Sequence, residues 1–343
     1  TEKYIVTDAT DGKLVIEKRK VTLTSEGGSK VYDGAPLTKP EVQIEGSFVE
    51  GEVTDIKATG KVTHVSEGEV TNTITFKKSE KFKESNYNII KTEGKLSITQ
   101  AETEVVVKIA GDTAIVPYDG KKHTVERWTV TSITETEPQY DASNIGFEGT
   151  AIAEGTDAGT YVMGLKDTQF KNTNGNFKNV TFVVEDGQLE IKKREVTLTS
   201  ETASKPYDGT ALTKPVVAVT GDGFVEGEVS DVKATGSVTN VSEGEVLNPI
   251  SVTPGEKFKA KNYSITKNEG KLSITPITDK VTVTITENFG TVTYDGTEHK
   301  VEGYKSMTAD NTLYNVATSV QEKPAEAWTA KGTNVGEYPV GIV

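Results

Sequence analysis

Tyr32-Asp33-Gly34 is a tripeptide that returns three times, as Tyr118-Asp119-Gly120, Tyr207-Asp208-Gly209 and Tyr294-Asp295-Gly296. Each copy follows a stretch rich in Thr and β-branched residues. Asp-Gly favours a tight turn, because Gly adopts positive φ without steric cost and Asp tolerates it. A Tyr ahead of the turn can place its ring on the core and its hydroxyl in solvent or on a backbone group. We therefore interpret the tripeptide as a structural turn of tandem repeats and not as an active site.

Two types of repeat alternate along the chain. The first type covers residues 19–100 and again 193–276, and both copies end in Gly-Lys-Leu-Ser-Ile-Thr. The second type covers residues 101–192 and starts again at 277, so that 277–343 form an incomplete copy. The Tyr residues of matching tripeptides are 207 − 32 = 175 and 294 − 118 = 176 positions apart. The repeating unit is therefore a pair of unlike modules.

The two ends of the chain fit this scheme. Residues 1–18 contain Gly12-Lys13-Leu14-Val15-Ile16, which matches Gly187-Gln188-Leu189-Glu190-Ile191, so we assign them to the closing strand of a preceding second-type repeat. The last copy has no such strand, and we expect the chain to be a fragment of a longer protein. A missing strand leaves backbone groups unpaired. We therefore predict head-to-tail self-association, in which the N-terminal strand of one molecule fills the gap in the next.

Strand signals are dense and helical signals are scarce. Val21-Thr22-Leu23-Thr24 and residues 281–286 alternate apolar residues with Thr, as half-buried strands do. Helix-like spacing occurs once in each first-type repeat, at Val49, Val53 and Ile56 and at Val225, Val229 and Val232. We predict a mainly β chain, a tandem array of small β-sandwich (Ig-like) modules, with β-grasp-like modules as the alternative. The junctions are very short, so we expect an elongated rod with at most one short helical turn per module, at the helix-like spacing.

The composition excludes several classes of function. The 343 residues include 51 acidic and 38 basic side chains, for a formal charge of −13, and only 34% are hydrophobic. Nucleic acids and anionic lipids select basic clusters, so the charge disfavours both. The absence of Cys excludes disulfides, thiol catalysis and Cys-based zinc sites. A secreted chain of Thr-rich strands without Cys is typical of bacteria, and no apolar run is long enough to cross a membrane.

The histidines do not indicate catalysis. His123 and His299 occupy the position at which first-type repeats have Leu37 and Leu212, so we interpret them as half-buried packing residues. His64 is replaced by Asn240 in its sibling repeat and is expected at the surface.

The carboxylates and the tryptophans have structural interpretations too. Asp8 and Asp11 lack the ligand spacing of a calcium loop. The repeated acidic residues are expected to belong to the module surface; these are Glu50, Glu52, Glu67 and Glu69, with Glu226, Glu228, Glu243 and Glu245. Trp128 and Trp328 are predicted to pack in the core. No motif marks a Lys–Asn amide cross-link, and we predict neither a catalytic, a metal-binding nor a cofactor-binding site.

The motifs as a set resemble a known family. Tyr-Asp-Gly after an opening strand, a Gly-x-Tyr in the third quarter, Asn86-Tyr87 or Asn262-Tyr263, and the closing Gly-Lys-Leu-x-Ile-Thr resemble the YDG and MBG-type repeats of bacterial surface proteins. The second type, from Tyr118 to Val125, looks like a Clostridia-type variant. The resemblance implies stalk or spacer modules of an extracellular, wall-attached adhesin that project a distal binding domain, without enzymatic activity. The alternative is a direct adhesive module that binds a host glycan or protein.

The rod hypothesis predicts an extended particle. A compact chain of this length has a radius of gyration of roughly 20 Å, whereas modules about 35 Å long placed end to end give about 40 Å. Small-angle scattering measures the difference. A value near the lower figure would contradict the rod.

Overall fold

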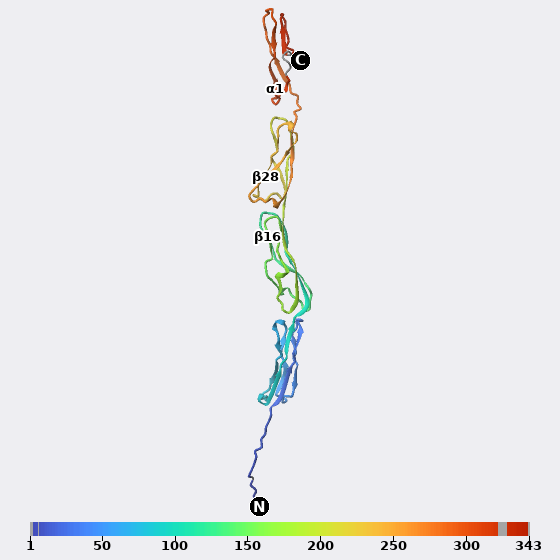
Figure 1. The fold of residues 1–343 in the computed structure, drawn as a ribbon, viewed down its shortest axis with the longest axis vertical. Helices are drawn as coiled ribbons and strands as arrows, with labels where there is room; N and C mark the ends of the chain where they lie inside the picture. Colours follow the sequence, from blue (N-terminus) through green and yellow to red (C-terminus); the bar gives the residue numbers. More distant parts are fainter. Residues whose placement is uncertain (1–2, 6, 322–327, 342–343) are drawn as a thin grey trace. The chain divides into compact units, whose positions relative to one another are not determined.

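The computed structural model describes residues 3–5, 7–321 and 328–341 (Figure 1). It divides into two compact units, residues 1–192 and 193–343, each containing two modules. The division lies at the predicted boundary between the second and third modules. Residues 1–2 and 6 of the predicted N-terminal segment, and 322–327 and 342–343 of the predicted last module, lie outside the described residues.

The first unit begins with residues 3–5 and 7–18, which belong to no helix or strand. The strands of its first module are β1 (Arg19–Ser25), β2 (Gly28–Val31), β3 (Leu37–Thr38), β4 (Val42–Glu45), β5 (Val53–Ala58), β6 (Lys61–Val62), β7 (Val70–Thr71), β8 (Ile74–Lys78), β9 (Tyr87–Thr92) and β10 (Lys95–Thr99). The 3₁₀ turns η1 (Val65–Glu67) and η2 (Glu84–Asn86) interrupt them.

The second module repeats this order with longer strands. These are β11 (Ala101–Gly111), β12 (Thr113–Pro117), β13 (His123–Glu126), β14 (Trp128–Ile133), β15 (Ile145–Phe147), β16 (Ile152–Gly155), β17 (Gly159–Val162), β18 (Phe170–Asn172), β19 (Phe177–Glu185) and β20 (Gln188–Lys192), with η3 (Ala142–Asn144) and η4 (Asp167–Gln169).

The third module, in the second unit, copies the first. Its elements are β21 (Arg194–Ser200), β22 (Ala203–Pro206), β23 (Leu212–Thr213), β24 (Val217–Gly221), β25 (Val229–Ala234), β26 (Ser237–Val238), η5 (Val241–Glu243), β27 (Val246–Asn248), β28 (Ile250–Pro254), η6 (Ala260–Asn262), β29 (Tyr263–Asn268) and β30 (Gly270–Thr275). The fourth module contains β31 (Val283–Glu287), β32 (His299–Glu302), β33 (Tyr304–Ala309), α1 (Val316–Ser319) and β34 (Thr329–Gly332).

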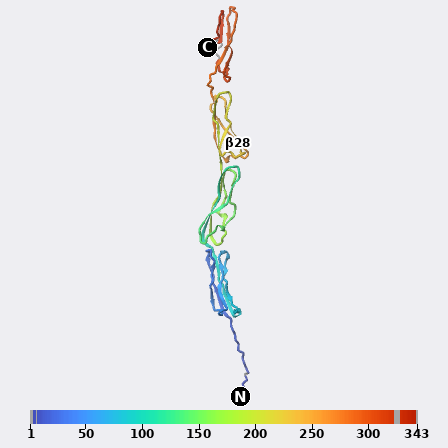
Figure 2. The ribbon, with the colours of Figure 1, turned by 180° about the vertical axis from the view of Figure 1, so that it is seen from behind.

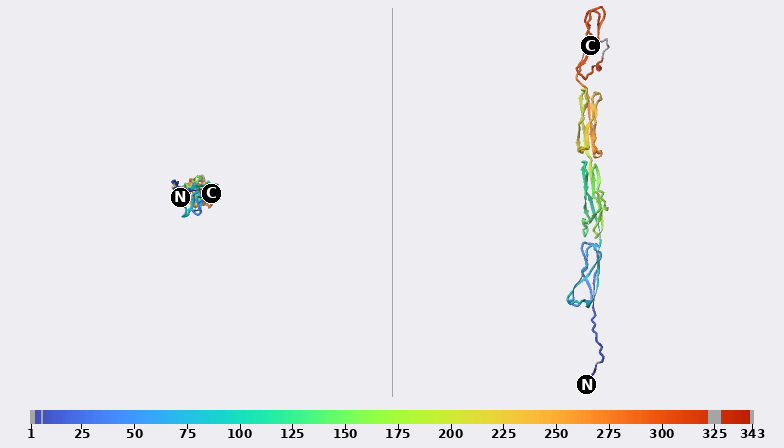
Figure 3. Two further views of the ribbon diagram at one scale, coloured as in Figure 1. Left: turned by 90° about the horizontal axis from the view of Figure 1, so that it is seen from below. Right: turned by 90° about the vertical axis from the view of Figure 1, so that its left-hand side faces the viewer.

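Small sheets of two or three strands build every module. In the first module the three-stranded sheets are β4-β1-β9 and β2-β10-β7, and the second and third modules repeat both orders. The central strand of each sheet has one parallel and one antiparallel neighbour; β10, for example, is parallel to β2 and antiparallel to β7. Within each module the strands lie side by side, as Figure 2 and Figure 3 show from further sides. The predicted mainly β class is confirmed.

Alternation of apolar residues with Thr produces the thin cores. In β1, Val21 and Leu23 are completely buried, whereas Thr22 and Thr24 are only half-buried. Val21 and Leu23 pack with Ile74 and Tyr87 in one cluster, and Val62, Leu96 and Ile98 form another. The core of the first module therefore consists of two small apolar clusters, one on β1, β8 and β9 and the other on β6 and β10.

The predicted helical turn at residues 49–56 is wrong. Residues 53–58 form β5, and a bulge between Thr54 and Lys57, with Asp55 at φ 54°, turns both Val53 and Ile56 to the half-buried side. A bulge thus gives two strand residues the three-residue spacing that resembles a helix. Each of the first three modules instead has two 3₁₀ turns elsewhere. Within residues 19–276, all of which the structure describes, no helix covers a sheet as in a β-grasp fold.

A buried asparagine ties together the loops of each first-type module. Asn72 is fully buried, and its side-chain amide donates to the carbonyls of Glu26 (3.0 Å) and Lys39 (2.8 Å). Its Oδ1 accepts from the backbone N–H of Gly60 (2.9 Å). Asn248 makes the same three contacts in the third module. Buried polar groups of this kind cost much stability when they lose their partners.

Replacing Asn72 by Ala is therefore expected to destabilise the first module by roughly 2–4 kcal/mol, because one N–H and two carbonyls lose their partners. Native-state hydrogen exchange at the amides of β8 and β10 in the full chain measures this loss. The control is Thr73→Ala, an exposed neighbour, expected to change stability by less than about 0.5 kcal/mol. Equal effects of the two substitutions would show that the Asn72 contacts contribute little.

Candidate functional site

The Tyr-Asp-Gly turns share one geometry in all four modules. The Asp side chain accepts a hydrogen bond from the backbone N–H two residues later, at 2.9 Å in each case, and the Gly that follows has φ between 78° and 85°. This φ is accessible to Gly but strained for other residues. The Asp thus begins an Asx turn whose second residue is the left-handed Gly.

In three modules the turn is bonded to the end of the closing strand. The Tyr N–H donates to the last residue of that strand: Tyr32 to Thr99, Tyr118 to Lys192 and Tyr207 to Thr275, at 2.8–2.9 Å. The Tyr ring packs on the neighbouring core, since Tyr118 is 3% exposed and Tyr207 contacts the Leu272 cluster. A hydrogen bond therefore connects the Tyr-Asp-Gly turn near the start of each of these modules to the last strand of the same module.

A cationic or imidazole side chain completes each turn. In first-type modules this side chain is a Lys that lies three residues before the Asp of the tripeptide. Lys30 Nζ lies 2.7 Å from the Asp33 carboxylate, and Lys205 Nζ lies 2.8 Å from that of Asp208. In the second type it is a His four residues after it, with His123 Nε2 2.8 Å from Asp119 and His299 Nε2 2.9 Å from Asp295. Both His side chains are half-buried, as the Leu counterparts suggested, and the bond to Asp is what the sequence analysis missed.

These bonds lower the pKa values of the turn carboxyls. The Lys30 and Lys205 ammonium groups are the main cause for Asp33 and Asp208, and the backbone N–H of Lys121 is the main cause for Asp119. The hydroxyl of Thr297 lowers the pKa of Asp295 to about 2. All four are carboxylates at neutral pH, engaged in their own turns and not poised to transfer a proton.

A junction inside the first unit brings together residues from two modules. Gln100 alone separates β10 from β11. The side chain of Asn176 in the second module accepts from the N–H of Val65 (2.9 Å) and lies 3.1 Å from His64 Nδ1. Its own carbonyl accepts from the N–H of Ala101 (2.8 Å). His64 is exposed, as expected, but it is also part of this contact.

Aromatic rings continue the same junction. Tyr32 of the first Tyr-Asp-Gly turn lies edge-on to Phe177 at 5.7 Å between ring centroids, and Phe177 lies edge-on to Tyr140 at 5.2 Å. The Tyr140 hydroxyl donates to Asn144 or Asn172, and burial raises the pKa of Tyr140 to about 12. The motif tyrosine is therefore both a turn residue and a contact to the next module.

The two tryptophans pack against other side chains, and the two N-terminal aspartates are exposed to solvent. Trp128 packs edge-on against Phe170 at 5.0 Å, and Trp328 is 8% exposed. Asp8 and Asp11 are exposed. Among the described residues, no group of three His, Cys, Asp or Glu could hold a metal ion. No described helix is long and apolar enough to cross a membrane.

The expectation that all the repeated acidic residues lie at the surface is wrong for Glu228, which is 3% exposed. Its carboxylate accepts from the Tyr263 hydroxyl at 2.8 Å, and that hydroxyl accepts from the N–H of Val225. Glu52 binds Tyr87 in the same way at 2.6 Å and is half-buried. Tyr263 and Tyr87 are buried, and each holds its Glu partner partly or fully inside the module through this hydrogen bond. The sequence repeat alone does not indicate this bond.

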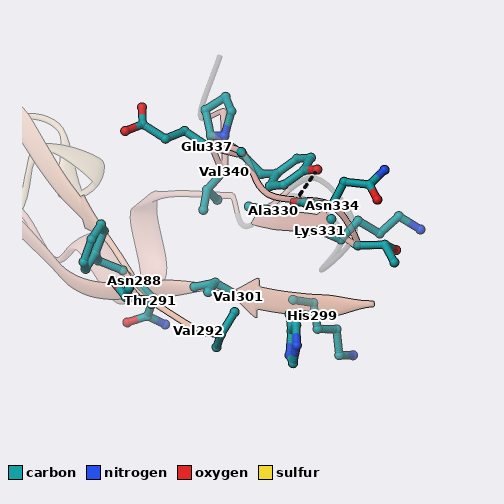
Figure 4. A pocket seen from close by; sticks show the side chains of 18 of the residues that line it. Asn288, Thr291, Val292, His299, Val301, Ala330, Lys331, Asn334, Glu337 and Val340 are labelled. Atoms are coloured by element: carbon teal, nitrogen blue, oxygen red, sulfur yellow. Dashed lines mark hydrogen bonds between the residues drawn. The ribbon is translucent and has the colours of Figure 1, made fainter. Parts of the chain in front are cut away.

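The fourth module contains a groove of about 810 Å³. Figure 4 shows Val292, Val301, Ala330 and Val340 around it, with Asn334 at one end. The polar groups there belong to backbone and to scattered side chains, so the groove has no catalytic arrangement among the described residues.

Comparisons with known proteins add little. No protein-family model matches the chain, and no curated protein matches it. Among solved structures, it is similar to the N-terminal eight Ig domains of Down Syndrome Cell Adhesion Molecule, isoform 1.30.30, at 11% identity. That similarity covers 84% of this chain and 47% of the other, with a TM-score of 0.19. A likeness this weak carries no argument about function.

The Thr297 hydroxyl gives a test of the turn electrostatics. Thr297→Val should raise the pKa of Asp295 from about 2 toward its ordinary value of 3.8, without reaching it because the backbone N–H remains. A carboxyl whose pKa is lowered by folding contributes to the free energy of unfolding. This contribution is complete above the ordinary pKa of the carboxyl and is lost as the pH falls through its pKa in the folded state. The variant should therefore lose this contribution at a higher pH than the parent. NMR titration of the Asp295 carboxyl measures the shift, with Asp208 of the third module as internal control, and an unchanged Asp295 would refute the role of the hydroxyl.

Proposed function

We propose that the chain is a spacer of a bacterial extracellular surface protein, a set of structural modules that holds a distal binding domain away from the cell. The role is non-catalytic. The observation that carries the proposal is the junction at Asn176, where two unlike modules of the first unit share hydrogen bonds and an aromatic contact.

Bending at this junction would break several contacts at once. With a single residue between β10 and β11, the junction has almost no free linker. A change of angle would separate Asn176 from Val65 and Phe177 from Tyr32. A spacer requires a stiff junction between its modules, whereas a loosely tethered binding domain does not require one.

A contact between the two modules of the second unit resembles one between the two modules of the first unit. The Gly209 turn of the third module approaches Leu313 of the fourth module, where an ideal Cβ on Gly209 would lie 3.0 Å from Leu313 Cδ2. In the first unit, Gly34 approaches Pro138 in the same manner at 3.4 Å. In both units, the Tyr-Asp-Gly turn of a first-type module thus faces the second-type module that follows it.

Composition supports the extracellular, bacterial setting. The strands carry Thr on their outer faces, the chain has no Cys, and its net charge of −13 keeps such a surface soluble and self-repelling. The distal domain would supply contacts with a host glycan or protein, and the chain itself would bind neither nucleic acid nor membrane.

Direct adhesion by these modules is the alternative, and it needs an exposed apolar or aromatic face. Phe289, Tyr294 and Tyr338 in the fourth module are 92%, 61% and 45% exposed. Their positions match residues of the second module that lie beside its closing strand, so this face has a structural explanation as well. For that reason we favour the spacer.

Stiffness at the junction is directly measurable. Because the chain has no Cys, Asn88→Cys and Thr160→Cys, both at exposed strand positions, place a unique pair of spin labels on the two modules of the first unit. Pulsed electron paramagnetic resonance should give one narrow distance distribution, and adding Asn176→Ala should broaden it. The control adds Thr173→Ala, which is close in sequence and outside the contact with Val65. A broad distribution in the parent, or no change with Asn176→Ala, would contradict a spacer stiffened at this junction.

A further inference from the structure

The turn that leads into β19 contains the only Asn-Gly dipeptide of the sequence, Asn174-Gly175. It is a β-turn in which the Phe177 N–H donates to the Asn174 carbonyl at 3.2 Å. Gly175 is exposed, and a Cβ built on it would meet no atom within 4 Å. No side chain on residue 175 therefore covers its backbone nitrogen.

The side-chain carbonyl of Asn174 is polarised within this turn. Its Oδ1 accepts a hydrogen bond from the Asn176 N–H at 3.1 Å, which closes an Asx turn around Gly175. A donor at this position stabilises the negative charge that forms on the oxygen when a nucleophile adds to Cγ, as the donors of an oxyanion hole do. The hydrogen bond therefore makes Cγ of Asn174 a better electrophile.

The N–H of Gly175 is activated through its own peptide group. The main-chain carbonyl of that group, on Asn174, accepts from the Phe177 N–H and from the Asn172 side-chain amide, the latter at 3.0 Å. Two donors on the carbonyl polarise the peptide group and make its N–H more acidic. No described residue accepts a hydrogen bond from this N–H, so a base from the solvent can take its proton.

We propose that Asn174-Gly175 is a self-modification site, at which the chain converts Asn174 into aspartate and isoaspartate without an enzyme. The Gly175 nitrogen gives its proton to a solvent base and forms a bond to Asn174 Cγ. The bond between Cγ and Nδ2 breaks, and Nδ2 takes a proton from the solvent and leaves as ammonia. The product is a cyclic imide, and its closure within one pair of residues has the kinetic advantage of an intramolecular reaction.

Water then opens the imide. It adds to one of the two imide carbonyls, the bond from that carbonyl to the Gly175 nitrogen breaks, and the nitrogen takes up a proton. Attack at the main-chain carbonyl leaves an isoaspartate, whose backbone runs through Cβ and Cγ, and attack at Cγ leaves an ordinary aspartate. Both products carry a carboxylate in place of a neutral amide.

An isoaspartate here loosens the junction between the first two modules. It lengthens the backbone by one carbon–carbon bond, about 1.5 Å. Beyond it, the Gly175 carbonyl accepts from Gln100 Nε2 at 2.9 Å, and the Asn176 carbonyl accepts from the Ala101 N–H at 2.8 Å. Hydrogen bonds of this kind span only about 2.7–3.2 Å, so the longer backbone breaks them. The bond from the Val65 N–H to the Asn176 side chain is lost with them.

The first-type modules provide an internal comparison. At the same place in the fold, ahead of β9 and β29, they have Glu84-Ser85 and Ala260-Lys261, each followed by an Asn and a Tyr. Every other Asn of the sequence also precedes a residue larger than Gly. The modification is therefore confined to the second module. It does not depend on the spacer role, because it follows from the turn alone.

Intact mass and peptide mapping of the full chain, residues 1–343, test the proposal during incubation at physiological temperature and mildly alkaline pH. The parent should gain the mass difference between OH and NH₂ at residue 174, part of it as isoaspartate. The folded parent should convert at least as fast as the parent in urea, because unfolding removes the hydrogen bonds that polarise the turn.

Gly175→Ala should slow the conversion by roughly tenfold or more, because its methyl group crowds the approach of the nitrogen to Cγ. The variant should fold, since the space around this position is open and Gly175 does not have a positive φ. Thr173→Ala is the matched control. It changes an exposed neighbour and should leave the rate unchanged.

Spin labels at Asn88→Cys and Thr160→Cys measure the effect on the junction. The distance distribution should broaden as isoaspartate accumulates, and it should stay narrow over the same time when Gly175→Ala is added. The mass measurement does not depend on whether the junction is stiff, so the two proposals fail separately. No gain in mass, a gain at another residue, a gain confined to urea, a rate that Gly175→Ala leaves unchanged, or conversion without broadening would each overturn the proposal.

Discussion

The closing strand is the element on which each complete module depends. β10, β20 and β30 each lie at the centre of a three-stranded sheet, and each buries a Leu and an Ile. Each also ends on the residue that accepts the hydrogen bond from the Tyr-Asp-Gly tyrosine. A strand bonded on both edges and at its end couples the beginning of a module to its end.

The same tyrosine also joins modules in the first unit. Tyr32 contacts Phe177, and the Asn176 side chain satisfies the N–H of Val65, a backbone group of the 3₁₀ turn η1. Because turn, closing strand and junction share residues, the fold of one module and its contact with the next are not independent. A substitution at such a position would affect both.

Much of this architecture was predictable from the sequence. The alternation in Val21-Thr22-Leu23-Thr24 predicted strands, and the tripeptide with its spacing predicted two types of module. The bulge in β5 was not predictable, since an extra strand residue and a helical turn produce the same spacing. The burial of Glu228 was missed because it depends on Tyr263, a residue distant in sequence. The junction was missed for a similar reason, since Asn176 has no distinctive motif and its partners His64 and Val65 belong to another module.

The parallel pairing of β2 with β10 has a mechanical consequence. The chain enters a module ahead of β2 and leaves it after β10, so tension along the backbone pulls the two strands in opposite directions along their length. The hydrogen bonds between them lie across the direction of pulling and must rupture together, whereas a hairpin pulled from one end opens bond by bond. Parallel pairs β12–β20 and β22–β30 repeat this arrangement. A module built in this way resists a pull applied along its backbone more strongly than a hairpin would.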